Sequence, residues 1–417
     1  MAEVRMLERK VGVFGAMILG LGSMLGSGVF VALPLVAERA GPPVVLAVVL
    51  AGLLATANGL SSAQLAANHP VSGGTYAYGR RWLRDDVGFL AGTLFLIAKS
   101  MSAATAVLGL VLYLAERLGW SVFQSGVPLR LAALGSLALL VWAVASGLRK
   151  TTVLNVVLVT GILAALVVFV VAGLVAPAQP AEAYSGPDGI GLFEATALLF
   201  VAYTGYGRIA TLGEEIREPR KNIPRAIILT LAVIALVYVL VAAVVVRQAG
   251  AATGIILTAT ADAFGGPGLA WLIEIGAFLA FFSVITTLLL GLSRVLFAMG
   301  RDGEAPARFG LLAGKHNEPV VAILGVAGLI GIGILVGDLY RVWSFSAVTV
   351  LAYYGTTHLC ALQLKPRERL FPRWIAWVGL AGCFGLALMV QPWAIAIAAV
   401  TLALAWLIRR AIRWRQA

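Results

Sequence analysis

Long apolar stretches alternate with short polar ones along almost the whole chain. Most of them are long enough to cross a hydrocarbon core of about 30 Å as a helix. They occupy residues 11–37, 43–67, 86–118, 129–147, 152–176, 190–213, 224–248, 268–300, 319–337, 339–363, 374–390 and 393–409. The pattern predicts an all-α polytopic membrane protein with twelve transmembrane helices. Only Gln391 and Pro392 separate the last two segments.

Two of these segments are interrupted by glycine and serine. The first contains GLGSMLGSGVF at residues 20–30, and the sixth contains LLFVAYTGYGRIATLGEE at residues 198–215. Both residue types disfavour helix interiors. A phosphate-binding loop would need a Lys-Ser/Thr pair after the glycines, which is missing here. The GxxxG spacing of Gly22 and Gly26 suits close helix packing, but it does not account for Gly205 and Gly207.

A break in both membrane helices accounts for both interruptions, which lie five segments apart. The segments of about 33 residues, 86–118 and 268–300, are also five apart. Five helices per half reverse the second half, so we expect a 5+5 inverted repeat with discontinuous helices 1 and 6. The first repeat covers about 11–176 and the second about 190–363. Two extra C-terminal helices (about 374–409) complete a single transporter domain over 1–417.

A broken membrane helix is tolerated only where its freed backbone groups line a cavity. The freed N–H groups that begin the outer half-helix form a site for a carboxylate. The freed carbonyls of the inner half-helix can hold an ammonium or a metal cation. An α-amino acid carries a carboxylate and an ammonium a few ångströms apart, so the pair of breaks predicts a site for a zwitterion.

Charge supports a membrane protein and fixes its predicted orientation. Charged residues make up 12% of the chain, against about 25% in soluble proteins. With both termini inside, the inner segments hold Arg5, Arg9, Lys10, Arg80, Arg81, Arg84, Arg149, Lys150, Arg217, Arg220, Lys221, Arg225, Arg301, Arg308, Lys315, Lys365, Arg367, Arg369, Arg373, Arg409, Arg410, Arg413 and Arg415. The outer loops hold Arg39, Arg117, Arg130, Arg247 and Arg341. This asymmetry follows the positive-inside rule. The net charge of +12 therefore indicates topology and no nucleic-acid partner.

Other chemistry is sparse. Cys360 and Cys383 both lie in apolar runs, and the three histidines have no metal-ligand spacing. No nucleophile with a base and no GxSxG motif is present, so we expect neither an enzyme nor a cofactor nor a bound metal. The first apolar segment lacks the small-residue cleavage site of a signal peptide.

Three stretches resemble the amino acid–polyamine–organocation (APC) superfamily of transporters. They are GSMLGSGVF with the following Pro34, FVAYTGYGRIATLGEEIREPRKNIPRAI at residues 200–227, and SRVLFAMGRDGEAP at residues 293–306. The resemblance extends in order across nearly the whole chain, and the second stretch is the most specific. It implies alternating access, with amino acids or related amines as substrates.

The resemblance also implies site residues. The substrate carboxylate would be held by the backbone around Met24, Ser27, Gly28 and Val29, and the amine by carbonyls near Phe200, Val201, Ala202 and Thr204. Tyr203, Tyr206, Lys99 and Ala103 are the expected gate and pocket residues, with Phe200 as a further gate candidate. Two charged residues that some members of the superfamily carry are missing. The lysine of helix 5 in some proton-coupled members and the glutamate after the helix 6 glycine in acid-resistance antiporters are replaced by glycine, at residues 161 and 207.

Several ionisable or polar residues are candidates for coupling. Lys99 lies deep in the third segment, where a charge is costly. It would carry a proton, recognise a polar or acidic substrate group, or form a structural ion pair with Glu274. Ser283, Thr286 and Thr287 share one helical face. With the carbonyls of Gly22 and Leu25 they would form a sodium site, or else bond their own helix. Arg208 would contact an anion or pair with a carboxylate, and Glu214 and Glu215 would pair with nearby basic residues.

The sequence therefore predicts a secondary transporter of small, neutral amino acids in the cytoplasmic membrane, with both termini in the cytoplasm. Proton-coupled uptake is the first expectation. The alternatives are sodium-independent exchange of one amino acid for another, sodium-coupled symport, and a non-transporting membrane sensor. The expected partners are the amino acid, a proton or sodium ion, and the lipid bilayer.

Overall fold

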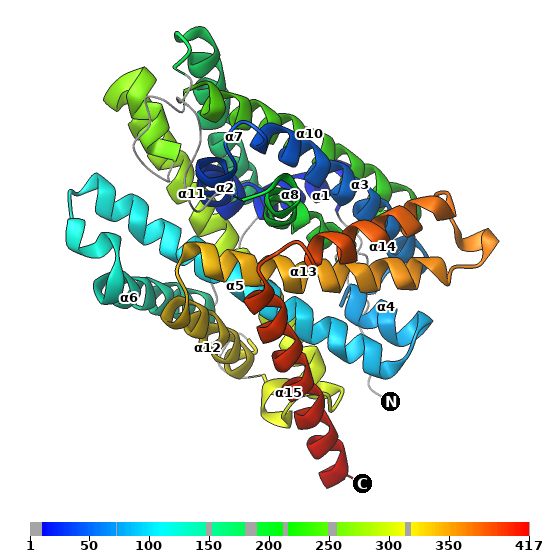
Figure 1. Ribbon diagram of the computed structural model, residues 1–417. Coiled ribbons are helices and arrows are strands. Elements are labelled where there is room, and N and C mark those ends of the chain that lie inside the picture. Colours follow the sequence, from blue (N-terminus) through cyan, green and yellow to red (C-terminus); the bar gives the residue numbers. More distant parts are fainter. Residues whose placement is uncertain are drawn as a thin grey trace.

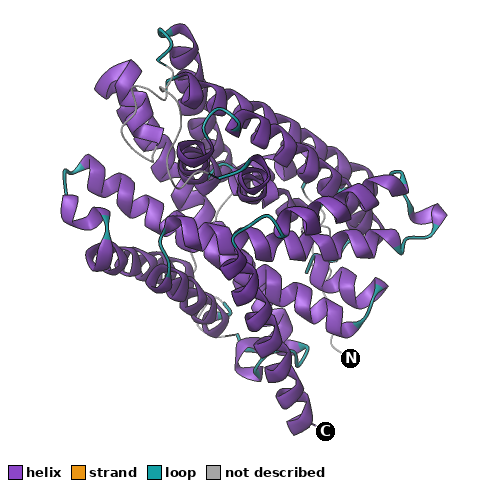
Figure 2. Cartoon of the chain, viewed as in Figure 1, coloured by secondary structure: helices purple, strands orange, loops and turns teal. Residues whose placement is uncertain are grey.

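The computed structural model of the protein describes residues 11–71, 73–146, 152–179, 190–211, 216–248, 257–312 and 318–416. Helices account for nearly all of these residues, and no strand occurs within them (Figures 1 and 2). An isolated bridge pairs Val11 with Ile216. Some of the basic residues expected inside, and the predicted cluster at Glu214 and Glu215, lie outside the described residues.

In the first half of the chain, the predicted broken helix consists of α1 (Val13–Met24), the π-helical turn η1 (Gly28–Ala32) and α2 (Leu33–Ala40). It is followed by α3 (Val44–Asn68), α4 (Thr75–Trp82), α5 (Asp85–Arg117), η2 (Ser121–Gln124), α6 (Gly126–Ala145) and α7 (Thr152–Val175).

In the second half, α8 (Leu192–Phe200), the 3₁₀ segment η3 (Val201–Tyr206) and α9 (Gly207–Thr211) form the second predicted broken helix. The remaining elements are α10 (Pro219–Arg247), α11 (Leu257–Arg301), η4 (Ala307–Gly310), α12 (Val320–Val336), α13 (Leu339–Leu362), η5 (Pro366–Glu368), α14 (Arg373–Ala387) and α15 (Pro392–Gln416).

The helix α11 begins eleven residues before the predicted segment at 268–300. Its backbone is not helical at Gly266, where φ is 68°, and Pro267 follows. Glycine tolerates positive φ, and proline cannot supply the N–H that would continue a helix. The predicted start is therefore close to the point where the second helical piece begins.

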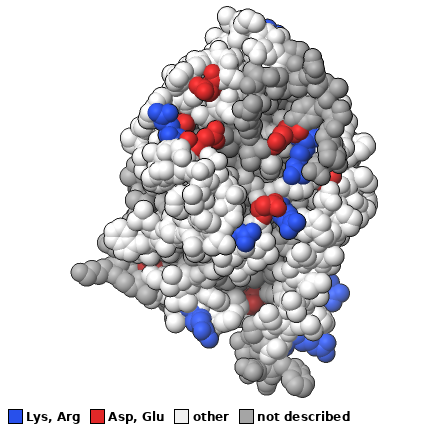
Figure 3. All heavy atoms as spheres, turned by 60° about the vertical axis from the view of Figure 1, so that its left-hand side comes forward, with Lys and Arg blue, Asp and Glu red and all other residues white. Residues whose placement is uncertain are grey.

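Eight helices in the described part of the chain are long and apolar enough to cross a membrane. The count takes α1 to α2 as one helix, and α12 and α14 are shorter apolar helices. Large apolar side chains are exposed on the outer helices, such as Trp142 on α6 and Leu404 on α15. Charged side chains are scattered over the face in Figure 3, with wide uncharged areas between them. Such surfaces suit lipid rather than water.

Helix α5 occupies the centre of the bundle. It packs against α13, α11, α4, α12 and α6, and its apolar window is the most buried of the eight. The helix α1 packs against α10, α7, α11 and η3. The two interrupted segments are therefore neighbours, although about 180 residues separate them in the sequence.

A buried ionic cluster fastens the C-terminal helix to this bundle. Arg409 of α15 donates from Nε and Nη2 to Glu304, at 2.5 and 3.0 Å, and pairs with Asp86 at the start of α5. The Arg409 and Glu304 side chains are 3% and 2% exposed. The Arg409 guanidinium also lies 4.8 Å from the centre of the Phe89 ring.

We expect Arg409→Ala to lower the free energy of unfolding by about 3–5 kcal/mol, because Glu304 would lose its guanidinium partner while staying buried. Thermal unfolding of the purified protein in detergent measures this loss. Arg410→Ala is the matched control, since the Arg410 side chain is exposed on the same helix. Equal unfolding midpoints for the two variants would contradict the prediction.

Candidate functional site

The first interruption leaves carbonyl groups that other helices satisfy. Leu25, with ψ at 85°, is not helical, and η1 begins at Gly28. Tyr238 of α10 donates its hydroxyl to the carbonyl of Met24 at 2.7 Å. Pro34 has no N–H to offer the carbonyl of Phe30 four residues before it. Tyr113 of α5 donates to that carbonyl instead, at 2.7 Å.

Side chains of other helices also satisfy the carbonyls of the second interruption. Its carbonyls accept hydrogen bonds from side chains of α10 and α13: Trp343 to Leu198 at 2.8 Å, Tyr238 to Ala202 at 3.3 Å, and Tyr354 to Thr204 at 3.0 Å. A 3₁₀ segment leaves carbonyls poorly satisfied at its junctions with α-helices. The surrounding aromatic donors therefore stabilise this segment in its 3₁₀ form.

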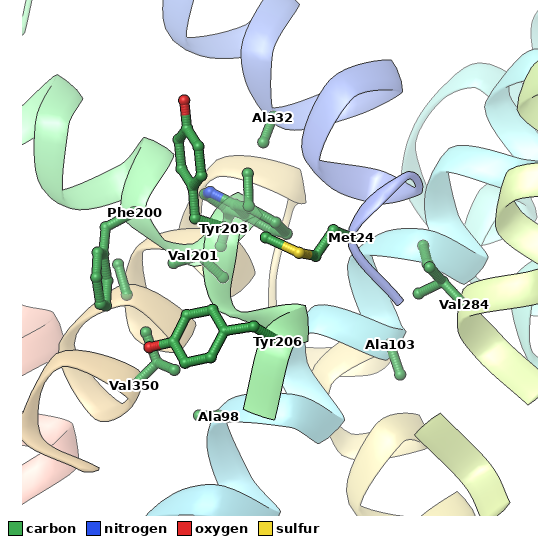
Figure 4. Close-up of a cluster of buried hydrophobic side chains, with 14 of the residues drawn as sticks. Met24, Ala32, Ala98, Ala103, Phe200, Val201, Tyr203, Tyr206, Val284 and Val350 are labelled. Carbon is green, nitrogen blue, oxygen red and sulfur yellow. The ribbon is translucent and has the colours of Figure 1, made fainter. Parts of the chain in front are cut away.

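Glycines bring the two interruptions into direct contact. A Cβ atom at Gly28 would lie 2.6 Å from the Cβ of Ala202 and 2.8 Å from the Tyr238 hydroxyl. A Cβ at Gly205 would lie 2.7 Å from the carbonyl of Ser23. The hydroxyl of Tyr238 bonds to carbonyls of both segments. Figure 4 shows the Met24 side chain beside the segment that carries Val201 and Tyr203.

Close helix packing, the competing interpretation of the first motif, also holds in part. Gly26 faces Val284 of α11, with no room for a further carbon atom. A Cβ at Gly22 would lie 3.2 Å from Val159 of α7. The motif therefore serves two purposes: Gly22 and Gly26 admit neighbouring helices, and Gly28 admits the second interruption.

The residues expected to bind the substrate lie together around this contact. Met24, Ser27, Gly28 and Val29 come from the first interruption, and Phe200, Val201, Ala202 and Thr204 from the second. All eight are buried. Thr204 also lines a cavity of about 150 Å³ beside the contact, together with Ser23 and Gly205. Its lining residues are Ser23, Gly73, Tyr76, Phe95, Lys99, Thr204, Gly205, Gly207, Arg208, Thr287, Leu288, Gly291, Leu292, Arg294, Val295 and Ala298.

Several lining residues were not among the predicted site residues. Tyr76 lies on α4, a short helix between two long segments, and its sequence has no motif that would place it at a cavity. Gly291 and Arg294 follow the predicted sodium set on α11 by one to two turns. Arg208 was predicted to contact an anion or to pair with a carboxylate, but the sequence did not predict its place in the cavity, which depends on how α9 is oriented.

The expected gate residues are aromatic side chains packed inside the protein. The Tyr203 hydroxyl donates to the carbonyl of Val48 at 3.1 Å. Tyr206 and Phe200 both lie against Tyr354, with ring centres 5.6 and 5.9 Å apart (Figure 4 shows Phe200 and Tyr206). Ala103, one turn along α5 from Lys99, is fully buried.

Lys99 contacts the second interruption directly. Its Nζ donates to Thr204 Oγ1 at 2.5 Å, and that hydroxyl donates to the carbonyl of Val201 at 2.6 Å. The side chain is buried. Lys99 thus connects α5 with the 3₁₀ segment through a single hydroxyl.

The alternative ion pair between Lys99 and Glu274 is wrong. Glu274 pairs with Arg117 at 3.5 Å, and the Arg117 guanidinium lies 3.6 Å from the centre of the Trp271 ring. Arg117 is 18 residues beyond Lys99 on α5. At 1.5 Å per residue this separation is about 27 Å, which places Glu274 beside the C-terminal end of α5, far from Lys99 near its middle.

The predicted sodium residues are only partly together. Ser283 Oγ donates to the carbonyl of Gly22 at 3.3 Å, and thereby connects α11 to α1. Thr286 donates to the carbonyl of Phe282, at 2.5 Å within its own helix, while Thr287 lines the cavity. Among the described residues, no group of three His, Cys, Asp or Glu side chains is placed to hold a metal ion.

Comparison with known families decides the class of protein. Residues 15–414 match the model of the amino acid permease family. The chain belongs to this family. The permease is therefore a multi-pass membrane protein of the APC superfamily, as the motifs predicted, and its family consists of transporters rather than enzymes.

Three relatives illustrate the match. An uncharacterized transporter of Mycobacterium tuberculosis (strain ATCC 25618 / H37Rv) is 36% identical over 408 residues, covering 95% of this chain and 89% of that protein. The branched-chain amino acid permease BcaP of Bacillus subtilis (strain 168) is 27% identical, covering 92% and 86%. The large neutral amino acids transporter small subunit 2 of Homo sapiens is 28% identical, covering 88% and 72%.

Proposed function

We propose that this permease moves small amino acids across the cytoplasmic membrane by alternating access. The observation that carries the proposal is the direct contact of two interrupted segments beside a cavity. Interrupted helices in corresponding positions are where transporters bind their substrates near the middle of the membrane. Two relatives, a branched-chain amino acid permease and a large neutral amino acids transporter, support amino acids with uncharged side chains.

In this proposal the two interruptions, which touch in this state, separate to admit the zwitterion between them. The amides of residues 27–29 hold the carboxylate at the start of the outer half-helix. Carbonyls of residues 200–202 and 204 hold the ammonium. Because Tyr238 and Tyr354 already bond to some of these carbonyls, the ammonium replaces or shares hydroxyl donors on entry. Tyr203 and Tyr206 close the pocket.

We place the end of the bundle that carries Arg80 and Arg301 in the cytoplasm, together with both termini, following the positive-inside rule. The cavity then opens towards the cytoplasm. At the opposite end, the Tyr340 hydroxyl donates to Glu194 at 2.7 Å. The guanidinium of Arg39 lies over the Tyr340 ring, 3.9 Å from the ring centre. These contacts support a state that is closed outside, as alternating access requires. The twelve spans and the 5+5 repeat, with α14 and α15 outside it, are part of this proposal.

Proton-coupled uptake is the proposed mode, with Lys99 as the proton carrier. Its bond to Thr204 connects a titratable amine to the 3₁₀ segment of the second interruption, so gain or loss of a proton on Lys99 changes a contact of the segment that binds the substrate. Sodium-independent exchange is the second candidate.

Transport by purified protein in liposomes tests the function. We expect a panel of labelled amino acids to show saturable uptake of small neutral ones, faster when the liposome exterior is acidic. Uptake that needs a preloaded amino acid instead identifies exchange. If no amino acid or amine enters under proton gradients, sodium gradients or preloading, the proposed function is wrong.

A further inference from the structure

The short helix α4 has no part in the proposed zwitterion site, although it reaches the cavity. Tyr76 and, just before the helix, Gly73 line the cavity wall. The helix packs against α5 and α13 (Figure 1). Its fit to α5 is close, because a Cβ atom at Gly92 would lie 2.9 Å from Cδ2 of the Tyr76 ring, and one at Gly79 would lie 2.7 Å from Cα of Gly88. The glycines therefore let α4 lie against α5 with the Tyr76 ring at the cavity.

The hydroxyl of Tyr76 is fixed to the end of α11. It donates to Asp302, the residue that follows α11, at 2.6 Å. Arg80 Nη1 donates to Asp302 at 2.6 Å and to the Tyr76 hydroxyl at 3.0 Å. Asp302 follows Ala298, a lining residue of α11, by one turn and donates its N–H to the carbonyl of Ala298. Tyr76, Arg80 and Asp302, here called the mouth cluster, thus tie together two elements of the cavity wall at the end proposed to face the cytoplasm.

The residue before Tyr76 connects α4 to α13. The backbone N–H of Thr75 donates to the hydroxyl of Tyr353 at 3.2 Å, and the Thr75 hydroxyl lies 2.7 Å from that of Thr357. An N–H group in the first turn of a helix has no partner within the helix, so the Tyr353 hydroxyl satisfies one that α4 cannot. Two successive residues of α4 therefore hold two different helices, α13 through Thr75 and the end of α11 through Tyr76.

Tyr353 lies beside the side chain that reaches the second interruption. Its ring packs edge-on against the ring of Tyr354, with centres 4.8 Å apart. Tyr354 donates its hydroxyl to the carbonyl of Thr204 at 3.0 Å, and this carbonyl is one of those proposed for the substrate ammonium. Gly207 lets the hydroxyl approach, because a Cβ there would lie 3.0 Å from it. Continuous contacts therefore run from the proposed ammonium site through two tyrosines of α13 to α4 and the mouth cluster.

We propose that Tyr353 and Tyr76 are positioning residues that connect the substrate site to the mouth of the cavity through α4. This inference rests on the proposed transport function. An ammonium that replaces the Tyr354 hydroxyl at Thr204 displaces the Tyr354 ring, which shifts Tyr353 and the start of α4 and weakens the mouth cluster. The cluster stabilises the state whose cavity opens at this end, and bound substrate favours the other state, because a ligand shifts an equilibrium through contacts that differ between the states.

A matched pair of tyrosines on α4 provides the test. Tyr78 is buried two residues beyond Tyr76, and within the described part of the chain its hydroxyl has no hydrogen-bond partner. Tyr76→Phe and Tyr78→Phe each remove one hydroxyl, but only the first breaks bonds to a charged pair. Ala298→Cys places a thiol on the cavity wall, while the native Cys360 and Cys383 are buried. The rate at which a water-soluble thiol reagent labels this variant reports how open the mouth is.

In the Ala298→Cys protein, Tyr76→Phe should slow labelling by up to about tenfold, the effect of one charge-assisted hydrogen bond on an equilibrium, and Tyr78→Phe should leave the rate unchanged. Saturating alanine should slow labelling when no tyrosine is changed, and Tyr353→Phe should remove this response. Equal labelling rates for Tyr76→Phe and Tyr78→Phe would overturn the proposal, as would a response to alanine that Tyr353→Phe retains.

Binding and folding separate this inference from the function on which it rests. Unfolding midpoints show that each variant is folded. Labelled alanine should still bind to Tyr76→Phe, since the ring that lines the cavity is kept, while uptake at saturating alanine falls. If the unmodified protein binds no amino acid, the proposed function is wrong. If it binds and takes up alanine, and Tyr76→Phe matches Tyr78→Phe in both labelling and uptake, only the connection through α4 is wrong.

Discussion

Gly28→Leu is expected to reduce amino acid binding by at least about a hundredfold. Even the first carbon of the new side chain would lie 2.6 Å from Ala202 Cβ and 3.0 Å from Ala202 Cα. A backbone neighbour cannot rotate away, so the two interrupted segments must separate. Overpacking a filled site in this way costs about 1–3 kcal/mol or more, and the geometry of the proposed zwitterion site is lost with it.

Two comparison variants make this result specific. Gly135→Leu adds the same side chain to α6, where no atom lies within 4 Å of the added Cβ, so binding should not change. Gly28→Ala adds only the first carbon and should give an intermediate affinity. Equilibrium binding of labelled alanine measures all three, with thermal unfolding as the test of folding. Gly28→Leu with unchanged affinity would show that the substrate binds elsewhere.

The positions of both helix breaks could be predicted because their causes are local. Glycine and serine inside long apolar runs have a known cost in a helix, and Pro34 removes a donor at a fixed distance from Phe30. The breaks found at Met24–Gly28 and Phe200–Gly207 coincide with the two motifs. Helix ends were predicted nearly as well, since the lengths of apolar segments follow the thickness of a membrane.

Contacts between distant helices could not be predicted in the same way. The sequence offered Glu274 as a partner for Lys99, but Glu274 pairs with Arg117 at the C-terminal end of α5, about 27 Å along the helix from Lys99. The sequence also did not predict that Tyr238, Tyr354 and Trp343 donate hydrogen bonds to carbonyls of the interruptions. Their roles depend on which helices surround the second interruption, and a tyrosine in an apolar run does not indicate which carbonyl it will contact.

Lys99→Met is expected to abolish the acceleration of uptake by a proton gradient. Lys99 is an amine that donates to the second interruption, through the hydroxyl of Thr204. Methionine keeps much of the volume of the lysine side chain, but cannot carry a proton. Lys99→Arg is the sharper variant, because a guanidinium keeps its charge and cannot release a proton usefully. Both variants should therefore lose coupling, although only one loses the charge.

Further variants separate coupling from binding. Thr204→Val removes the hydroxyl that connects Lys99 to the carbonyl of Val201, and we expect it to weaken the response to a proton gradient while Lys99 remains in place. Lys221→Met is the control, since Lys221 is exposed and pairs with Glu218 on the surface. Uptake into liposomes, with and without an inward proton gradient, gives the coupling as a ratio. If Lys99→Met and Lys99→Arg both keep the ratio of the unmodified protein, the proton enters by another group, and the contact between Lys99 and Thr204 serves only to hold α5 against the second interruption.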